Sequence, residues 1–97
     1  MKQLTVFCSR DLEPQVVSTL DDAGLHAYLR VAGATGNRFL PKGQMPRTVT
    51  WEAVMIVVPG ADDALIDGIR EKLQGIAAAC EVEPCIRLLV NTGVENY

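Results

Sequence analysis

The stretch TVTWEAVMIVVPG, from Thr48 to Gly60, decides the fold of this chain. Its first six residues alternate between polar and apolar side chains, which is the period of a β-strand. Residues 54–58 are apolar without interruption, so both faces of this strand must be covered. The sequence leaves open which set of side chains faces the helices: Val54, Ile56 and Val58, or Ala53, Met55 and Val57.

Further strands and helices can be assigned on either side of this strand. We expect Asp11 to cap the first helix and Gly24 to end it in the left-handed conformation. The Pro-Gly pair is a strong breaker that ends the central strand. Asp62 or Asp63 then begins the second helix, where a carboxylate suits the helix dipole. The expected elements are a strand over 3–8, a helix over 12–23, strands over 25–31 and 48–58, a helix over 62–77 and a strand over 85–91.

The order of these elements is strand, helix, strand, strand, helix, strand. It predicts the α+β class with a ferredoxin-like βαββαβ arrangement, in which an antiparallel sheet has both helices on one face. We expect one domain over residues 1–97. The second face of the sheet should be polar if it met water. Phe7, together with whichever alternating set of the third strand points away from the helices, makes it apolar instead. This face is therefore predicted to self-associate.

Composition limits the possible functions. The formal net charge of -3 argues against a nucleic-acid-binding protein, for which a basic domain is expected. No stretch approaches the roughly 18 apolar residues of a membrane span, so no membrane insertion is expected. The first residues lack the features of a signal peptide, and we expect a cytoplasmic protein.

The chain has three cysteines, two of which form a C-x4-C pair at Cys80 and Cys85. Such a pair could close a small disulfide loop if its Cα atoms came within about 7 Å of each other. In a cytoplasmic protein the expected state is two reduced thiols. The sequence does not decide whether these two cysteines ever pair.

Residues for catalysis or metal binding are scarce. His26 is the only histidine, so neither a zinc site nor a nucleophile paired with a histidine base can be assembled. No Gly-x-Ser-x-Gly, Ser-x-x-Lys or His-Glu-x-x-His motif is present. We therefore predict a protein that is not an enzyme, with no catalytic residues and no bound metal.

The best binding candidate lies in the segment between the second and third strands, which is far longer than the 2–5 residues or so of a hairpin loop. Gly33-Ala-Thr-Gly36 is followed there by Asn37 and Arg38. Glycines let a backbone approach a ligand, successive N–H groups can bind an anion, and arginine offers a planar fork for phosphate or carboxylate. The alternative is a strand exit that needs glycine for its turn.

As a whole the pattern resembles the PII-like signalling proteins. The resemblance rests on MKQLTV at the start, on LEPQVVSTLDDAGL from Leu12, and on the glycine-rich residues 33–38. The apolar third strand and the short last strand also match. Members of this family are ferredoxin-like trimers that bind adenine nucleotides in the clefts between subunits, so the resemblance implies a homotrimer with its sheets packed around the threefold axis.

The resemblance also implies a T-loop at about residues 36–47, a loop that senses ligand state and transmits it. The implied nucleotide- and anion-binding residues lie at the base of this loop. They are Gly33, Thr35, Gly36, Asn37 and Arg38 on one side and Arg47 on the other. Residues 39–46 contain no Tyr, Ser or Thr, so the modified side chain of nitrogen-regulatory members is missing.

Two phosphate-binding segments of the nitrogen-regulatory members are missing as well. Residues 77–84, before the last strand, contain neither lysine nor glycine, and no basic segment follows that strand. Fewer cations favour fewer phosphates, hence ADP or AMP over ATP. This form is most similar to the carboxysome-associated PII-like proteins, which implies a bicarbonate-sensing role in signalling inorganic-carbon or energy state to a protein partner.

Two other kinds of function stay open. A small ferredoxin-like enzyme is one, either an acylphosphatase or an αβ-barrel monooxygenase or isomerase. Arg10 follows the first strand without the glycines that an acylphosphatase needs around its arginine. A trimeric metal-binding protein is the other, for which ligands are few.

Overall fold

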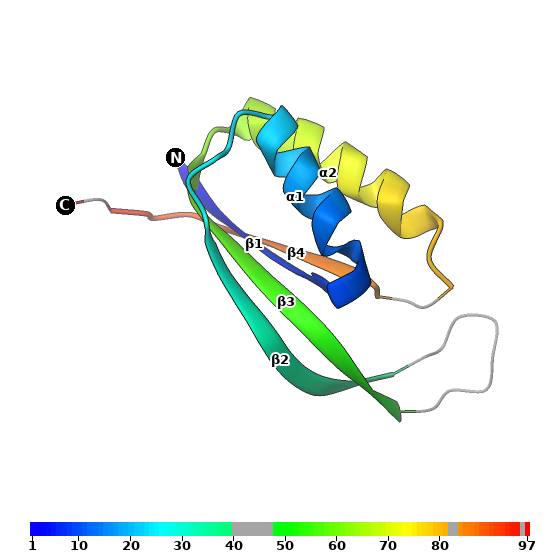
Figure 1. The fold of residues 1–97 in the computed structure, drawn as a ribbon. Coiled ribbons are helices and arrows are strands. Elements are labelled where there is room, and N and C mark those ends of the chain that lie inside the picture. The colour runs from blue at the N-terminus through cyan, green and yellow to red at the C-terminus, as the bar shows by residue number, and fades with distance from the viewer. Residues whose placement is uncertain (40–47, 82–83, 96) are drawn as a thin grey trace.

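The computed structural model describes residues 1–39, 48–81, 84–95 and 97. Its four strands form one antiparallel sheet in the order β2-β3-β1-β4, and both α-helices lie on the same face of it (Figure 1). The ferredoxin-like prediction is confirmed. The elements are β1 (Lys2–Ser9), a short 3₁₀ helix η1 (Arg10–Leu12), α1 (Glu13–Asp22), β2 (Leu29–Phe39), β3 (Thr48–Ala61), α2 (Asp63–Ala78) and β4 (Ile86–Asn91).

The core lies between the sheet and the two helices. Alternate residues of β1 and β3 point into it, and each is at most 1% exposed: Leu4, Val6, Cys8, Val54, Ile56 and Val58. The helices bury Val16 and Leu20 of α1, together with Ile66, Ile69 and Leu73 of α2, against this layer. Fully burying one such aliphatic side chain contributes about 1.5–3 kcal/mol. The open question of the third strand is thereby settled, because the set that includes Ile56 faces the helices.

The start of α1 differs from the prediction. Asp11 lies inside η1, and the residue before α1 is Leu12, which makes no capping hydrogen bond through its side chain. The 3₁₀ turn continues directly into the helix, so its backbone takes the place of the expected Asp11 cap.

The end of α1 is as expected. Gly24 has a φ of +81°. Its N–H donates to the carbonyl of Asp21, and the N–H of Leu25 donates to the carbonyl of Leu20, both at 2.9 Å. This pair of bonds is a Schellman motif, which needs a left-handed residue.

The second helix begins as its acidic start predicts. The Asp62 carboxylate accepts a hydrogen bond from the backbone N–H of Leu65 at 2.9 Å. Asp63 forms an ion pair with Lys2 at 2.6 Å, and a hydrogen bond from Lys2 is the main reason that the pKa of Asp63 is lowered. These contacts fix the start of α2 over the start of β1.

The predicted bounds of the second strand are wrong. β2 begins at Leu29 rather than at residue 25, and it continues through the glycine-rich residues that were expected to form a loop. Val31 lies opposite Met55, whereas Ala34 lies opposite Ala53. The extra residue on β2 is a β-bulge, and Gly33 adopts a φ of +77° there. Gly33 therefore supplies a bulge within a strand rather than a strand exit.

The third strand also runs further than predicted. β3 continues past the Pro-Gly pair to Ala61, which lies opposite Lys2. Leu4 lies opposite Val58, so β3 has one extra residue between these two pairings. A proline is tolerated within a strand at such an irregularity. The pair thus lies within the strand, at its shift of register, instead of ending it.

The expectation of two reduced thiols at the C-x4-C pair is overturned. Cys80 and Cys85 form a disulfide, with their Cα atoms 6.5 Å apart. Among the residues that the structure describes, Cys8 is the free cysteine, and it is buried. The disulfide joins the chain just after α2 to the chain just before β4.

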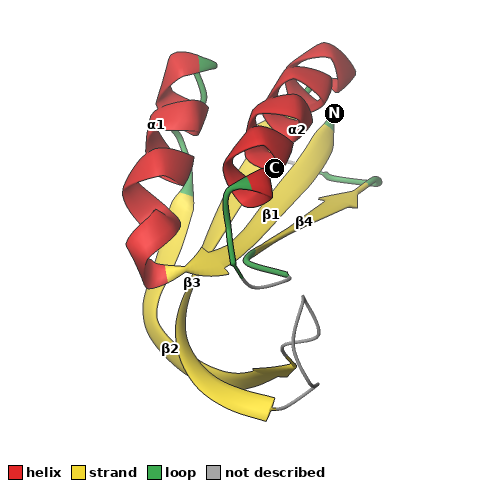
Figure 2. Cartoon of the chain, turned by 90° about the vertical axis from the view of Figure 1, so that its right-hand side faces the viewer, coloured by secondary structure: helices red, strands yellow, loops and turns green. Residues whose placement is uncertain are grey.

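Both α-helices lie on one side of the sheet, and within the described residues no helix covers the second face, which we call the open face (Figure 2). Its most exposed apolar side chains are Leu29, Val31 and Leu89, at 66%, 47% and 41%. Phe7, Ala53, Met55 and Val57 lie between them and are partly exposed. The prediction of an apolar second face is confirmed. In the described part of the chain, no helix is long and apolar enough to cross a membrane.

Candidate functional site

Most of the predicted binding residues lie along one strand. Gly33, Thr35, Gly36, Asn37 and Arg38 belong to β2, whereas Arg47 lies outside the described residues. Because a strand rises about 3.3 Å per residue, the two ends of this run are roughly 16 Å apart. The expected turn with clustered backbone N–H groups is absent from this strand, since its residues pair with β3. A role for these residues in binding stays a prediction.

Asn37 is the predicted residue that reaches a cavity. It helps to line a hollow of about 460 Å³ between the far end of β2, the first part of β3, the end of β1 and the start of β4. The Asn37 side-chain oxygen accepts a hydrogen bond from the hydroxyl of Thr50 at 3.1 Å, which orients the amide. We name this cavity the Arg87 hollow; its lining residues are Phe7, Asn37, Trp51, Pro84, Cys85, Ile86, Arg87 and Leu89.

The chemistry of the Arg87 hollow is aromatic and cationic. Phe7 of β1 lies directly opposite Arg87 of β4, and Trp51 lies opposite Gly36. A Cβ added at Gly36 would lie 3.8 Å from the indole nitrogen of Trp51, an ordinary van der Waals contact, so the indole lies over this position of β2. Among the described lining residues, Arg87 alone carries a charge. A volume of this size lies within the roughly 300–1,000 Å³ of small-molecule sites.

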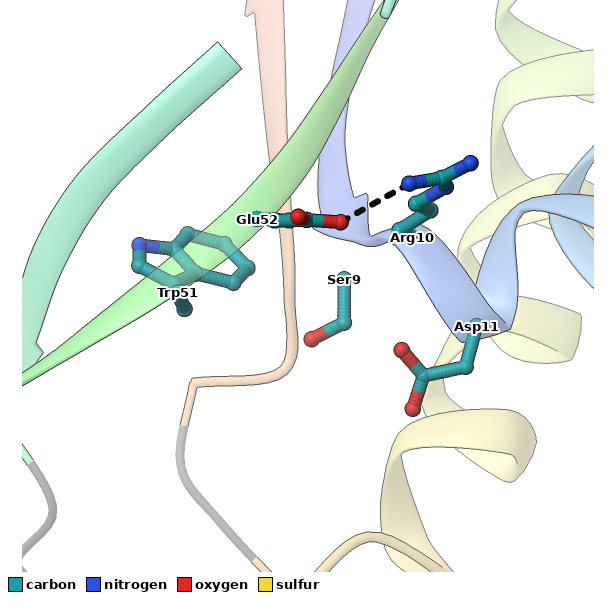
Figure 3. Close-up of a pocket in the computed structure, with 5 residues that line it drawn as sticks. All are labelled: Ser9, Arg10, Asp11, Trp51 and Glu52. Atoms are coloured by element: carbon teal, nitrogen blue, oxygen red, sulfur yellow. Dashed lines mark hydrogen bonds and ion pairs between the residues drawn. The ribbon is translucent and has the colours of Figure 1, made fainter. Parts of the chain in front are cut away.

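Trp51 also lines a second hollow, of about 450 Å³. We name it the Arg10 hollow; Ser9, Arg10, Asp11, Trp51 and Glu52 line it (Figure 3). The Arg10 guanidinium donates a hydrogen bond to the Glu52 carboxylate at 3.0 Å. That bond, with the charge of Glu52, raises the pKa of Arg10. The guanidinium thus faces a carboxylate, which weakens the acylphosphatase alternative, since that enzyme needs its arginine to bind phosphate.

A third hollow, of about 420 Å³, lies between η1, the start of α1 and the end of α2. We name it the Cys80 hollow, because the half-buried Cys80 lines it. Cys85 lines both this hollow and the Arg87 hollow, and Ser9 lines both this one and the Arg10 hollow. The three hollows therefore surround the end of β1 and share their walls.

Sequence reasoning missed most of the residues that line the Arg87 hollow. Phe7, Trp51 and Arg87 were each placed on a strand, but only the strand register shows that they meet. One signal was available, because the last strand was expected to begin at Cys85. The side chains just after it, including Arg87, were thus bound to lie at that end of the sheet.

The structure offers little support for a metal centre. Across the described residues, no group of three His, Cys, Asp or Glu side chains could hold a metal ion. His26 lies with its Nδ1 atom 3.3 Å from the Asp21 carboxylate, and the two side chains are 72% and 46% exposed. Asp21 belongs to the end of α1 and His26 to the connection before β2, and neither lines one of the three hollows.

Known structures share this fold. The structure of CPII, a nitrogen regulatory PII-like protein from Thiomonas intermedia bound to ADP, AMP and bicarbonate, matches with a TM-score of 0.69. The match covers 93% of this chain and 86% of that chain, at 20% sequence identity. The fold is that of the PII-like proteins. No protein-family model and no curated protein sequence matches the chain.

Two further structures show the PII-like fold as well. CPII bound to ADP and bicarbonate matches over 97% of this chain and 88% of that chain, at 15% identity and a TM-score of 0.64. GlnK of B. subtilis in complex with ATP matches over 92% and 77%, at 10% identity and a TM-score of 0.66. The PII-like arrangement predicted from the sequence is thus confirmed at the level of the fold.

Proposed function

We propose that this chain is a non-enzymatic PII-like regulatory sensor that binds an adenine nucleotide, ADP or AMP in preference to ATP, and bicarbonate. The proposal rests mainly on the Arg87 hollow, which combines aromatic rings with one cation on the open face of a PII-like fold. The similarity to CPII bound to ADP, AMP and bicarbonate supports the choice of ligands.

The lining residues suit a nucleotide with few phosphates. Trp51 and Phe7 offer ring faces on which an adenine base can stack, an interaction of about 1–3 kcal/mol per base. The planar guanidinium of Arg87 matches phosphate oxygens as a bidentate donor. A single cation among the described lining residues does little to favour a triphosphate, whose additional charge needs additional partners.

The proposed site lies between subunits. The Arg87 hollow opens on the same face as the exposed Leu29, Val31 and Leu89. We propose that this face packs in a homotrimer, so that a neighbouring subunit closes the hollow over the bound nucleotide. Burying these side chains would also remove a contiguous apolar surface from water.

Bicarbonate is proposed to bind beside the nucleotide. It is a small planar monoanion whose oxygens suit an arginine fork and backbone N–H donors. The predicted T-loop, at about residues 36–47, would then transmit ligand state to a protein partner of the inorganic-carbon machinery in the cytoplasm or the carboxysome. Residues 40–47 lie outside the described residues.

Calorimetry at fixed salt and magnesium tests the nucleotide site. AMP and ADP should bind at least as tightly as ATP. Arg87→Ala should weaken ADP binding by roughly 10–150-fold, because a charge-assisted hydrogen bond contributes about 1.5–3 kcal/mol. Lys72→Ala, which removes an exposed cation from α2, is the matched control and should bind ADP normally. Absence of binding for all three nucleotides would overturn the proposal.

Bicarbonate requires a separate measurement. ADP is titrated with and without millimolar bicarbonate, with chloride matching the ionic strength and with pH held constant. Real coupling between two sites changes affinity by about 5–150-fold, and it is reciprocal. Identical ADP curves would leave a nucleotide-binding protein and remove the inorganic-carbon role.

A further inference from the structure

The Cys80–Cys85 disulfide lies at the wall of the proposed ligand site. Residues 84–87 all line the Arg87 hollow, and Cys85 is among them. The backbone of this segment is attached to β1, because the Ser9 N–H donates to the Cys85 carbonyl at 3.3 Å. The disulfide attaches it on the other side to the end of α2 through Cys80. A backbone hydrogen bond and a covalent bond thus hold Cys85 between β1 and α2, next to the pairing of Ile86 with Cys8.

The two sulfur atoms differ in access. Both cysteines line the Cys80 hollow, but Cys85 is only 4% exposed, whereas Cys80 is half-buried. A reductant from solution therefore meets the sulfur of Cys80 first. Thiol–disulfide exchange needs such access to one sulfur, and the other sulfur is then the leaving group.

We propose that Cys80 and Cys85 form a thiol–disulfide exchange site that sets the shape of the Arg87 hollow, with a dithiol as the reductant. This inference rests on the proposed function where it concerns the ligand. In the oxidised form the wall at Pro84 and Cys85 is held in place for binding. In the reduced form the covalent link to the end of α2 is lost, while the Ser9 hydrogen bond and the pairing of Ile86 with Cys8 remain, and the hollow binds its ligand more weakly.

The exchange balances in two steps. A thiolate of the dithiol attacks the Cys80 Sγ, the Cys80–Cys85 bond breaks, and the Cys85 sulfur leaves with the electron pair and takes a proton from water. The second thiolate of the dithiol then attacks the reductant sulfur of the mixed disulfide. Cys80 leaves as a thiolate and is protonated, and the dithiol becomes a disulfide. Two electrons pass to the protein.

Cys8 does not compete in this exchange. It is fully buried, and burial is the main reason that its pKa is raised to about 11. Little thiolate is therefore present at neutral pH, and a thiol without thiolate is a poor nucleophile. Cys8 thus offers an internal control for experiments on the other two cysteines.

Ligand binding and the disulfide must influence each other equally. If oxidation strengthens ADP binding by some factor, bound ADP disfavours reduction of the disulfide by the same factor. A regulatory coupling of ordinary size would be about fivefold or more. The coupling can therefore be measured either as the change in ADP affinity on oxidation or as the change in the ease of disulfide reduction when ADP is bound.

The first experiment counts thiols. The protein is equilibrated with oxidised or with reduced dithiothreitol, denatured in acid, and alkylated in denaturant before mass spectrometry. We expect one adduct in the oxidised form and three in the reduced form, since the chain has three cysteines. Three adducts after oxidation would overturn the proposal.

The second experiment uses Trp51, the single tryptophan of the chain, which lines the Arg87 hollow. Its emission is recorded in both redox forms without ligand, and ADP is then titrated into each. We expect a shift in emission on reduction and an ADP affinity lower by about fivefold or more. Cys8→Ala should keep both responses. Cys80→Ser should show the Trp51 emission and the ADP affinity of the reduced form after either redox treatment.

The outcomes separate this inference from the proposed function. Equal emission in the two forms, or equal ADP affinity, overturns the inference and leaves nucleotide binding intact. A shift of Trp51 emission without ADP binding in either form supports the redox control of the hollow and removes the nucleotide function. If Cys80→Ser does not fold, the two redox forms of the unmodified chain still decide between these outcomes.

Discussion

Leu29 lies directly opposite Val57 on the open face of the sheet, and its side chain is 66% exposed. The next pair on this face, Val31 and Met55, is apolar as well. Cross-strand neighbours of this kind present a continuous apolar surface, and its exposure to water in a monomer is unfavourable. The proposed assembly and the first prediction follow from this surface.

Val57→Asp should dissociate the proposed homotrimer. A carboxylate at the centre of the packed face would be buried without a partner, which costs several kcal/mol. Size exclusion with light scattering should give about three times the 10.5 kDa chain mass for the unmodified protein and one chain mass for the variant. Ser18→Asp, at an exposed position of α1, is the control and should stay assembled. A monomeric unmodified protein would contradict the prediction.

Gly33→Ala should destabilise the protein, whereas Gly68→Ala should not. A Cβ at either position meets nothing within 4 Å, so only the backbone conformation differs. Gly33 has a φ of +77°, where a side chain costs about 1–2 kcal/mol. Gly68 lies within α2, where alanine is favoured by about 0.8–1.0 kcal/mol. Urea unfolding at one protein concentration measures both, and equal effects would be inconsistent with the bulge.

These glycines also show how far the sequence could predict the fold. The core strands were predictable because the alternation at Leu4 and Val6, and the unbroken apolar run at 54–58, are typical of buried strands and of little else at that length. Gly33 was ambiguous, because a turn and a bulge both require a positive φ. The alternation over residues 25–28 was misleading as well. These residues form a connecting segment that begins at the Schellman motif, and such a segment can alternate between polar and apolar side chains by chance.

The site was less predictable than the fold. The Arg87 hollow brings together residues from four strand segments, and their meeting depends on register. Register follows from which face is buried, and the sequence left that open for the third strand. The disulfide could not be predicted either, because cysteine spacing does not fix the distance between Cα atoms.

Glu13→Gln should cost more stability than Asp67→Asn. Arg30 reaches Glu13 through two guanidinium nitrogens at 2.5 Å, and the Glu13 side chain is only 16% exposed. Removing the carboxylate charge there should cost about 1.5 kcal/mol. Asp67 pairs with Arg70 at 2.9 Å on an exposed helix surface, where such a pair contributes about 0.3–0.5 kcal/mol.

Thermal or urea unfolding at low and high salt tests this comparison. The effect of Glu13→Gln should persist at about 1 M salt, because partly buried pairs are screened less than exposed ones. The small effect of Asp67→Asn should disappear under the same conditions. If both variants responded to salt alike, the link between Arg30 and Glu13 would not contribute more than an ordinary surface pair.

Alkaline pH should destabilise the protein through Cys8. Its pKa rises from 9.0 in the unfolded chain to about 11 in the folded one, mainly by burial, with smaller contributions from Glu13 and Asp11. Below pH 9 the thiol is protonated in both states and costs nothing. Between about pH 9 and 11 only the unfolded chain releases the proton, so stability falls by roughly 3 kcal/mol.

The measurement of this effect uses a background with Cys80→Ser and Cys85→Ser, in which no disulfide can be attacked. In that background, the difference in unfolding free energy between the chain that keeps Cys8 and the chain with Cys8→Ala should shrink by that amount from about pH 8 to 11. Parallel curves would mean that the Cys8 thiol titrates in the folded protein as it does in the unfolded chain.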